Sequence, residues 1–197
     1  MAGIGKAVER SAIDKRPVAG PVQVGVTGLD GDEQADRVNH GGLRKAVYAY
    51  AEEDLQHFSE LLDRPLRPGQ FGENVTTRGV AVSSAIVGEV WRVGTTVLEV
   101  CGPRIPCRTF QVWMDEPQWV RRFTAEARPG AYLRVMNPGV IEAGDQVQIE
   151  HRPDHGLTVA DVFRAFTTDR SQLAVLARHP GIPQRLRDDA RRRLARS

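Results

Sequence analysis

Cys107 lies in a segment whose residue types could do chemistry. The segment 101–108 reads Cys-Gly-Pro-Arg-Ile-Pro-Cys-Arg, and its two prolines fix φ and withhold backbone donors, which holds a thiol in one place. Arg104 and Arg108 flank the thiol, and nearby positive charge favours a thiolate that can act as a nucleophile or a soft-metal ligand. A cysteine in another setting is more often a small buried hydrophobe. We therefore interpret Cys107 as functional, and Cys101, at a strand end, as structural.

A second segment, 39–47, reads Asn-His-Gly-Gly-Leu-Arg-Lys-Ala-Val. Its glycines, Gly41 and Gly42, would let backbone N–H groups approach an anion, and His40 and Lys45 could add hydrogen bonds or charge. The spacing is not that of a P-loop, and an ordinary surface turn is the alternative interpretation. Phosphate binding is therefore a hypothesis for this segment.

A third segment, 68–77, places two glycines around an aromatic residue and follows them with amide, carboxylate and hydroxyl groups, which can bind the edge of a heterocycle. The candidate residues are Phe71, Gly72, Glu73, Asn74 and Thr76. The alternative is a glycine turn that enters a strand whose polar residues face water. A fourth segment, 130–135, is a predicted strand with one basic residue, Arg134, for which a solvated strand arginine is the alternative.

Short β-like runs must position these segments. Alternating or β-branched residues at 22–26, 89–93, 95–100 and 146–150 are separated by glycine turns, which indicates many short strands in a barrel or sandwich. Two helices interrupt them: 52–62, with apolar residues on one face, and 117–127, which Pro117 can begin. The expected fold class is mainly β, with short helices interspersed.

The pattern changes after residue 155, and a boundary there gives two parts, 1–155 and 156–197. Thr158 followed by Asp161 resembles a capping box, Ser171 can cap a second helix, and Pro183 can begin a third. The second part is therefore predicted to be a small module of three helices.

Composition excludes several classes of function. The chain has 197 residues, 41% of them apolar and 26% charged, with no run of about 20 apolar residues that could span a bilayer. The net charge of +2 does not favour nucleic acid as the main partner. The first residues do not read as a signal peptide, and two cysteines make no disulfide framework, so a cytoplasmic location is expected.

The order of these motifs resembles that of the MOSC family, and within it the YiiM-like branch. The resemblance rests on the segments 28–36, 39–50, 71–74 and 103–107, and it covers nearly the whole chain, because that branch also carries three helices after its barrel. The pair Leu43-Arg44 departs from the pattern, since relatives often have an acidic residue before the lysine. The resemblance implies a MOSC β-barrel that binds molybdenum cofactor.

The resemblance also implies roles for the candidate residues. Cys107 would be the molybdenum ligand or a carrier of sulfur, and His40 a second catalytic residue. The glycine segments would line the site, and Lys45, Arg104 and Arg134 are candidates for binding the cofactor's phosphate. The implied reaction is two-electron reduction of N-hydroxylated compounds such as hydroxylaminopurines.

Two other functions stay open at this point. The first is a sulfur-carrier or cofactor-delivery protein with a persulfide on Cys107, and the second is a binding module that docks a partner through its helical end. The chain has no Gly-x-Gly-x-x-Gly fingerprint for flavin or nicotinamide, so a reductase of this kind would need an external electron-donor protein. The sequence also permits a homodimer.

Overall fold

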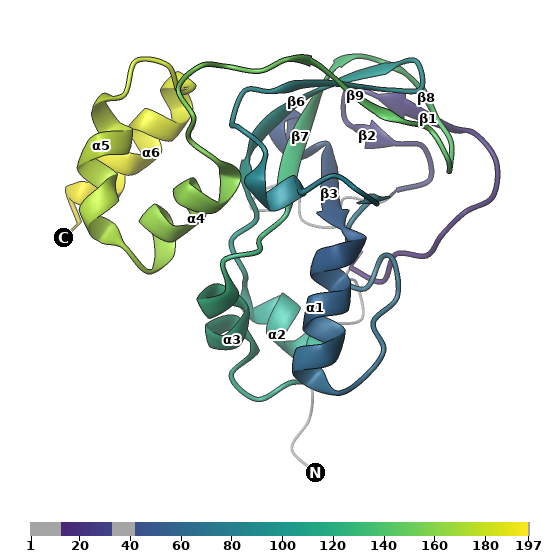
Figure 1. Ribbon diagram of the computed structural model, residues 1–197, viewed down its shortest axis with the longest axis horizontal. Coiled ribbons are helices and arrows are strands. Elements are labelled where there is room, and N and C mark those ends of the chain that lie inside the picture. The colour runs from purple at the N-terminus through teal and green to yellow at the C-terminus, as the bar shows by residue number, and fades with distance from the viewer. Residues whose placement is uncertain (1–12, 33–41, 197) are drawn as a thin grey trace.

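The computed structural model describes residues 13–32 and 42–196, and it contains two β-sheets and a helical periphery (Figure 1). The smaller sheet has the order β2-β1-β8 and is antiparallel throughout. Its strands are β1 (Val22–Gly25), β2 (Gly28–Leu29) and β8 (Gly139–Ile141). Among the described residues, no helix is long and apolar enough to cross a membrane.

The larger sheet has six strands in the order β4-β3-β7-β6-β5-β9, and only the β3–β4 pair is parallel. The strands are β3 (Val47–Ala51), β4 (Val75–Thr77), β5 (Val90–Val93), β6 (Thr96–Pro103), β7 (Ala131–Asn137) and β9 (Val147–His151). The register of β6 against β7 shifts twice, between Val97 and Leu98 and between Val100 and Gly102. Such irregularities increase the local twist, which suits a curled, barrel-like sheet.

Strand β3 is buried along its whole length, because both faces of the sheet are covered. Alternate side chains of a strand point to opposite faces. Tyr48 and Tyr50 therefore enter a cluster of aromatic residues, while Val47, Ala49 and Ala51 enter an aliphatic cluster.

Three helices cover the aromatic face: α1 (Glu52–Leu62), α2 (Arg108–Met114) and α3 (Trp119–Glu126). They bury Phe58, Phe110, Trp119 and Phe123, whose rings pack edge to face, stacked or tilted at centroid distances of 5.2–5.6 Å. Such ring pairs add stability beyond the area that they bury. This aromatic packing fixes α2, and so it fixes the loop that precedes α2.

The C-terminal helices are α4 (Val159–Thr167), α5 (Leu173–Arg178) and α6 (Gln184–Leu194), at the left of Figure 1. Helix α4 contacts β6, and its Val159 and Val162 belong to the same aliphatic cluster as the sheet residues. Helices α5 and α6 join that cluster through Leu173, Leu176 and Leu186. The aliphatic core therefore continues from the sheet into the C-terminal helices.

The predicted architecture of a barrel-like β core, interspersed helices and three C-terminal helices is confirmed. Thr158 and Asp161 form the expected capping box, and Pro183 precedes α6 as its cap. Gln172 rather than Ser171 caps α5. Helix α2 was not predicted, because its seven residues follow directly on the cysteine loop and carry no capping side chain.

Candidate functional site

Cys107 is the N-cap residue of α2, with extended backbone and a half-buried side chain. The first N–H groups of a helix lack partners within the helix and give its N-terminus a partial positive charge. The thiol also packs at the edge of the aromatic cluster. Cys107 is therefore accessible on one side and held on the other, as a ligand or a nucleophile requires.

Arg104 is a buried cation, with 7% of its surface exposed. Its Nη1 donates a hydrogen bond to the carbonyl oxygen of Phe71, and the guanidinium lies 5.1 Å from the ring centre of Tyr48 and 4.2 Å from that of Phe110. No carboxylate among the described residues forms an ion pair with it. A buried charge normally has a counter-charge, so this arrangement suits an anion from outside the chain.

Tyr132 lies near residues of two predicted segments, Lys45 of the second segment and Cys107 of the first. It lies opposite Tyr48 across the β3–β7 pair, with ring centres 5.2 Å apart, and the Lys45 ammonium lies 5.6 Å from its ring centre. Burial raises the pKa of Tyr132; Arg104 lowers it and Cys107 raises it, so both groups are electrostatic neighbours of the phenol. The structure thus brings Lys45, Arg104 and Cys107 around one tyrosine.

Sequence reasoning missed Tyr48, which directly follows the segment 39–47, and Tyr132, which lies within the segment 130–135, because in these segments it singled out histidine, glycine and basic residues. One pattern could have found Tyr132: it stands two residues before Arg134, so both side chains share one face of a strand.

Glu73 stabilises the glycine-rich turn. It is buried, and its two carboxylate oxygens accept hydrogen bonds from the N–H groups of Gly69 at 2.6 Å and Phe71 at 3.0 Å. The hydroxyl of Thr76 donates to the same carboxylate at 3.2 Å. Burial raises the pKa of Glu73, and these hydrogen bonds oppose the rise. In this structure Glu73 and Thr76 shape the turn, and Phe71 is a core residue.

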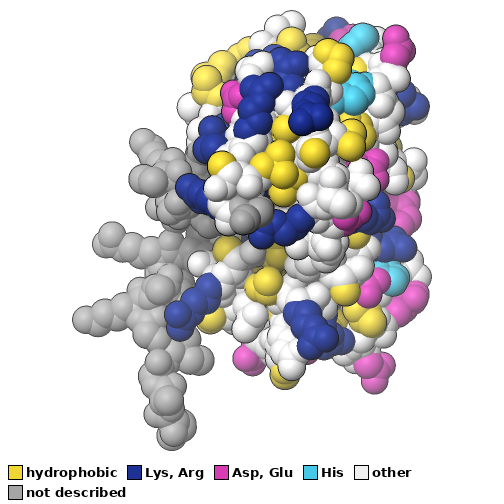
Figure 2. Space-filling model, turned by 90° about the vertical axis from the view of Figure 1, so that its left-hand side faces the viewer, with side chains coloured by type: hydrophobic (Ala, Val, Ile, Leu, Met, Phe, Trp, Pro, Cys, Tyr) yellow, Lys and Arg dark blue, Asp and Glu magenta, His cyan; other side chains and the backbone are white. Residues whose placement is uncertain are grey.

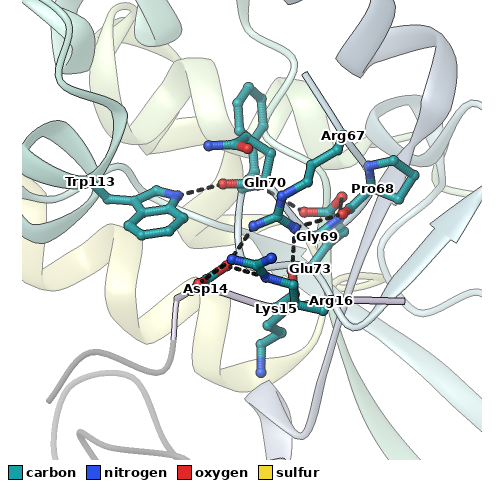
Figure 3. A network of polar contacts seen from close by, with 10 residues as sticks. Asp14, Lys15, Arg16, Arg67, Pro68, Gly69, Gln70, Glu73 and Trp113 are labelled. Carbon is teal, nitrogen blue, oxygen red and sulfur yellow. Dashed lines mark hydrogen bonds and ion pairs between the residues drawn. The ribbon is translucent and has the colours of Figure 1, made fainter. Parts of the chain in front are cut away.

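The N-terminal segment closes over the same turn, as Figure 3 shows. Arg67 donates hydrogen bonds to the carbonyl oxygen of Lys15 at 2.5 Å and to the carboxylate of Asp14 at 2.5 Å. Trp113 of α2 donates to the carbonyl oxygen of Gln70 at 2.7 Å. A Cβ on Gly72 would lie 2.9 Å from the side chain of Ile13, so this glycine permits the close approach.

Asn74 connects three parts of the chain. Its side-chain oxygen accepts from the N–H of Tyr48 at 2.9 Å, and its own N–H donates to the Tyr48 carbonyl at 2.8 Å. Its side-chain amide donates to Asp32 at 2.7 Å. Asn74 thereby fixes the strand that carries Tyr48.

Arg134 lies beyond Tyr132 on β7 and pairs with Glu99, its cross-strand neighbour on β6. Cys101 is close to this pair: burial raises its pKa to about 11, Glu99 adds to the rise, and Arg44 and Arg134 oppose it. Because Glu99 already neutralises Arg134, Arg104 is the better candidate for binding an anion.

The second predicted segment is described only in part. His40 and Gly41 lie outside the described residues. Gly42 is exposed, with a positive φ of 101° and no atom within 4 Å of a Cβ that might be added there. Lys45 closes the 3₁₀ turn η1 (Leu43–Lys45), which contacts β7.

Comparison with known proteins identifies the class to which this fold and site belong. The MOSC domain family matches residues 36–148, which include Lys45, Tyr48, Arg104, Cys107 and Tyr132. The chain therefore belongs to the MOSC domain family.

Relatives share most of the chain. The uncharacterized protein YflK of Bacillus subtilis (strain 168) is 33% identical over 88% of this chain and 78% of its own length. The crystal structure of YiiM from Geobacillus stearothermophilus matches with a TM-score of 0.77 and 29% identity, over 92% of this chain and 88% of that one. A protein named "Reductase" from Gibberella moniliformis is 31% identical over 88% of this chain, which spans only 31% of that relative's length.

Proposed function

We propose that this protein binds molybdenum cofactor and reduces N-hydroxylated compounds, with Cys107 as the molybdenum ligand. Membership of the MOSC family supports the cofactor, and the name of the fungal relative supports the class of reaction. The observation that carries the proposal is the juxtaposition of a buried, carboxylate-free guanidinium, Arg104, with a half-exposed thiol at a helix N-terminus, Cys107.

These residues fit the chemistry of the cofactor's donor groups. The cofactor carries a phosphate, and a phosphate suits a guanidinium that has no carboxylate partner. Molybdenum takes soft sulfur ligands, which a thiolate supplies. Arg104 would bind the phosphate, with Lys45 as a second cation, and Cys107 would bind the metal.

The protein's own part in the reaction is to bind and to orient. The bound cofactor would supply the two-electron chemistry. The net change is R–NH–OH plus two electrons and two protons to R–NH₂ plus water, so an external reductant must supply the electrons. Tyr132, which is half-buried and an electrostatic neighbour of Cys107, would offer a ring against which a planar substrate such as a hydroxylaminopurine can stack, with the buried ring of Tyr48 packed beside it.

The test uses holoprotein from a host that makes the cofactor. Molybdenum content and reduction of 6-hydroxylaminopurine by reduced methyl viologen are measured for the wild type, Cys107→Ala and Cys101→Ala. We expect the wild type and Cys101→Ala to turn over and Cys107→Ala to fall by at least about 100-fold. Loaded wild type without turnover would overturn the reductase proposal and favour a sulfur carrier, in which Cys107 would yield a persulfide detectable by mass spectrometry.

A further inference from the structure

Positive charge is concentrated in the C-terminal helices. Residues 157–197 contain nine arginines and four aspartates, a net charge of +5, so the other 156 residues carry −3 of the chain's total of +2. The net charge of this part of the fold is therefore clearly positive, although the chain as a whole is nearly neutral. Figure 2 looks onto this side, and Lys and Arg side chains lie around hydrophobic ones in its upper half.

Three of these arginines gather where α5 ends and α6 begins, and we call this end of the module the α5–α6 corner: Arg178, His179, Arg185, Leu186 and Arg187. Arg178 is exposed in the last turn of α5, and Arg185 is exposed in the first turn of α6. Arg187 donates hydrogen bonds to the carbonyl oxygens of His179 and Pro180. These acceptors are uncharged, so they do not neutralise the guanidinium. Among the described residues, the one carboxylate that pairs with an arginine of the corner is Asp189, and its Oδ2 lies as far as 3.8 Å from Arg185 Nε.

The corner lies beside the strand that leads to the candidate site. A Cβ on Gly102 of β6 would lie 3.6 Å from the side chain of Leu186, so α6 packs directly on that strand. Gly102 comes two residues before Arg104 and five before Cys107. A molecule bound at the corner would therefore lie close to the candidate site, separated from it by the packed side chains of α6 and β6.

Apolar surface accompanies the charge. A hollow of about 240 Å³ opens between α4 and α5. Its lining combines three apolar residues with polar and charged ones: Leu157, Val175 and Leu176 with Asp161, Arg164, Asp169 and Gln172. Val175 is 51% exposed and Leu194 of α6 is 38% exposed. Small apolar areas within a charged surface are typical of transient protein interfaces, in which charge steers the encounter.

We propose that the α5–α6 corner is the docking surface for an acidic electron-transfer protein that carries a flavin or an iron–sulfur cluster. This inference rests on the proposed function, since only a reductase needs such a donor. The match to the fungal "Reductase" leaves about two thirds of that relative's length outside the matched region. A protein fits better than nucleic acid, because Asp188 and Asp189 interrupt the arginines of α6 and pair with Arg191 and Arg192.

The test compares two electron sources for the same holoprotein. Reduction of 6-hydroxylaminopurine is driven by reduced methyl viologen, a small molecule, or by a reduced flavodoxin, an acidic protein. In the variant Arg178→Glu/Arg185→Glu, we expect the KM for flavodoxin to rise about tenfold or more while the methyl viologen rate stays within twofold. The milder Arg178→Gln/Arg185→Gln should show a smaller rise.

The matched control is Arg78→Glu/Arg92→Glu, which makes the same charge change at an exposed arginine that directly follows β4 and at a half-buried arginine of β5. Arg92 lies opposite Val97, at the far end of β6 from Gly102. We expect this variant to behave as the wild type with both electron sources. An unchanged KM for flavodoxin in the corner variants, or an equal rise in the control, would overturn the proposal.

Direct binding keeps the docking proposal separate from the proposed reaction. Calorimetry at 50 mM NaCl should detect flavodoxin binding to the wild type and about tenfold weaker binding to the corner variant, whether or not the substrate turns over. Tighter binding of a short DNA duplex than of flavodoxin, lost in the same variant, would overturn the choice of a protein partner.

Discussion

Arg104 donates a hydrogen bond to the main-chain carbonyl oxygen of Phe71. This bond joins the cysteine loop to the glycine-rich turn, two segments that are more than thirty residues apart in the chain. The guanidinium is thereby fixed between the rings of Tyr48 and Phe110. Since the bond occupies only one of its five donors, Arg104 keeps donors for a ligand.

Replacing Arg104 should affect the cofactor more than the fold. In Arg104→Met we expect loss of most bound molybdenum and pterin. The free energy of unfolding of the cofactor-free protein should change by less than about 2 kcal/mol, because removal of a buried unpaired charge offsets the lost hydrogen bond. Arg108→Met is the matched control, since Arg108 is exposed and also adjoins Cys107. Equal cofactor loss in both variants, or unfolding of Arg104→Met alone, would contradict this role.

The two thiols should differ in reactivity. Because burial raises the pKa of Cys101 to about 11, only roughly one Cys101 thiol in several thousand is ionised at pH 7.5. Cys107 is half-exposed at a helix N-terminus, where a thiolate is favoured. We expect iodoacetamide at pH 7.5 to modify Cys107 first, as measured by peptide mass spectrometry. Equal rates of modification would show that Cys101 is less shielded than the structure indicates.

The glycine-rich turn should tolerate no side chain at Gly69. A Cβ there would lie 2.3 Å from the carbonyl oxygen of Lys15, whereas one on Gly79 would have no atom within 4 Å, and both glycines have positive φ. Gly79→Ala should cost about 1 kcal/mol in backbone strain. Gly69→Ala should cost at least about 1–2 kcal/mol more in urea unfolding, because the N-terminal segment must move. Similar costs for the two variants would contradict the close approach.

Glu73 should make stability depend on pH in a definite direction. Burial raises its pKa in the folded protein, so its contribution to stability is full below the pKa of the unfolded chain and is lost as pH rises through the folded pKa. The difference in free energy of unfolding between wild type and Glu73→Gln should therefore become less favourable to the wild type above about pH 4.5. Urea denaturation at several pH values measures it. A difference that grows with pH would contradict the raised pKa.

The general architecture could be predicted from the sequence because its cues are local. Alternating strands, glycine turns and the Thr158 capping box each lie within a few residues of the element that they specify. The cysteine loop was also visible, since two prolines and two arginines surround Cys107.

The interior of the site could not be predicted because it depends on contacts between distant segments. Tyr48 faces Tyr132 only once β3 and β7 pair, and the pairing of Arg134 with Glu99 depends on the register of β6 against β7. Asn74 and Glu73 look like ligand-binding residues in the sequence, but in the structure their side chains hydrogen-bond to the backbone of neighbouring segments. Whether they also contact a ligand remains a prediction.

The most direct test of the central claim is molybdenum K-edge X-ray absorption of the holoprotein, wild type against Cys107→Ser. If the Cys107 thiolate binds the metal, the wild type will show one more sulfur neighbour of molybdenum than the variant. Identical sulfur shells in two proteins that both contain molybdenum would show that Cys107 is not a ligand, and would contradict the account.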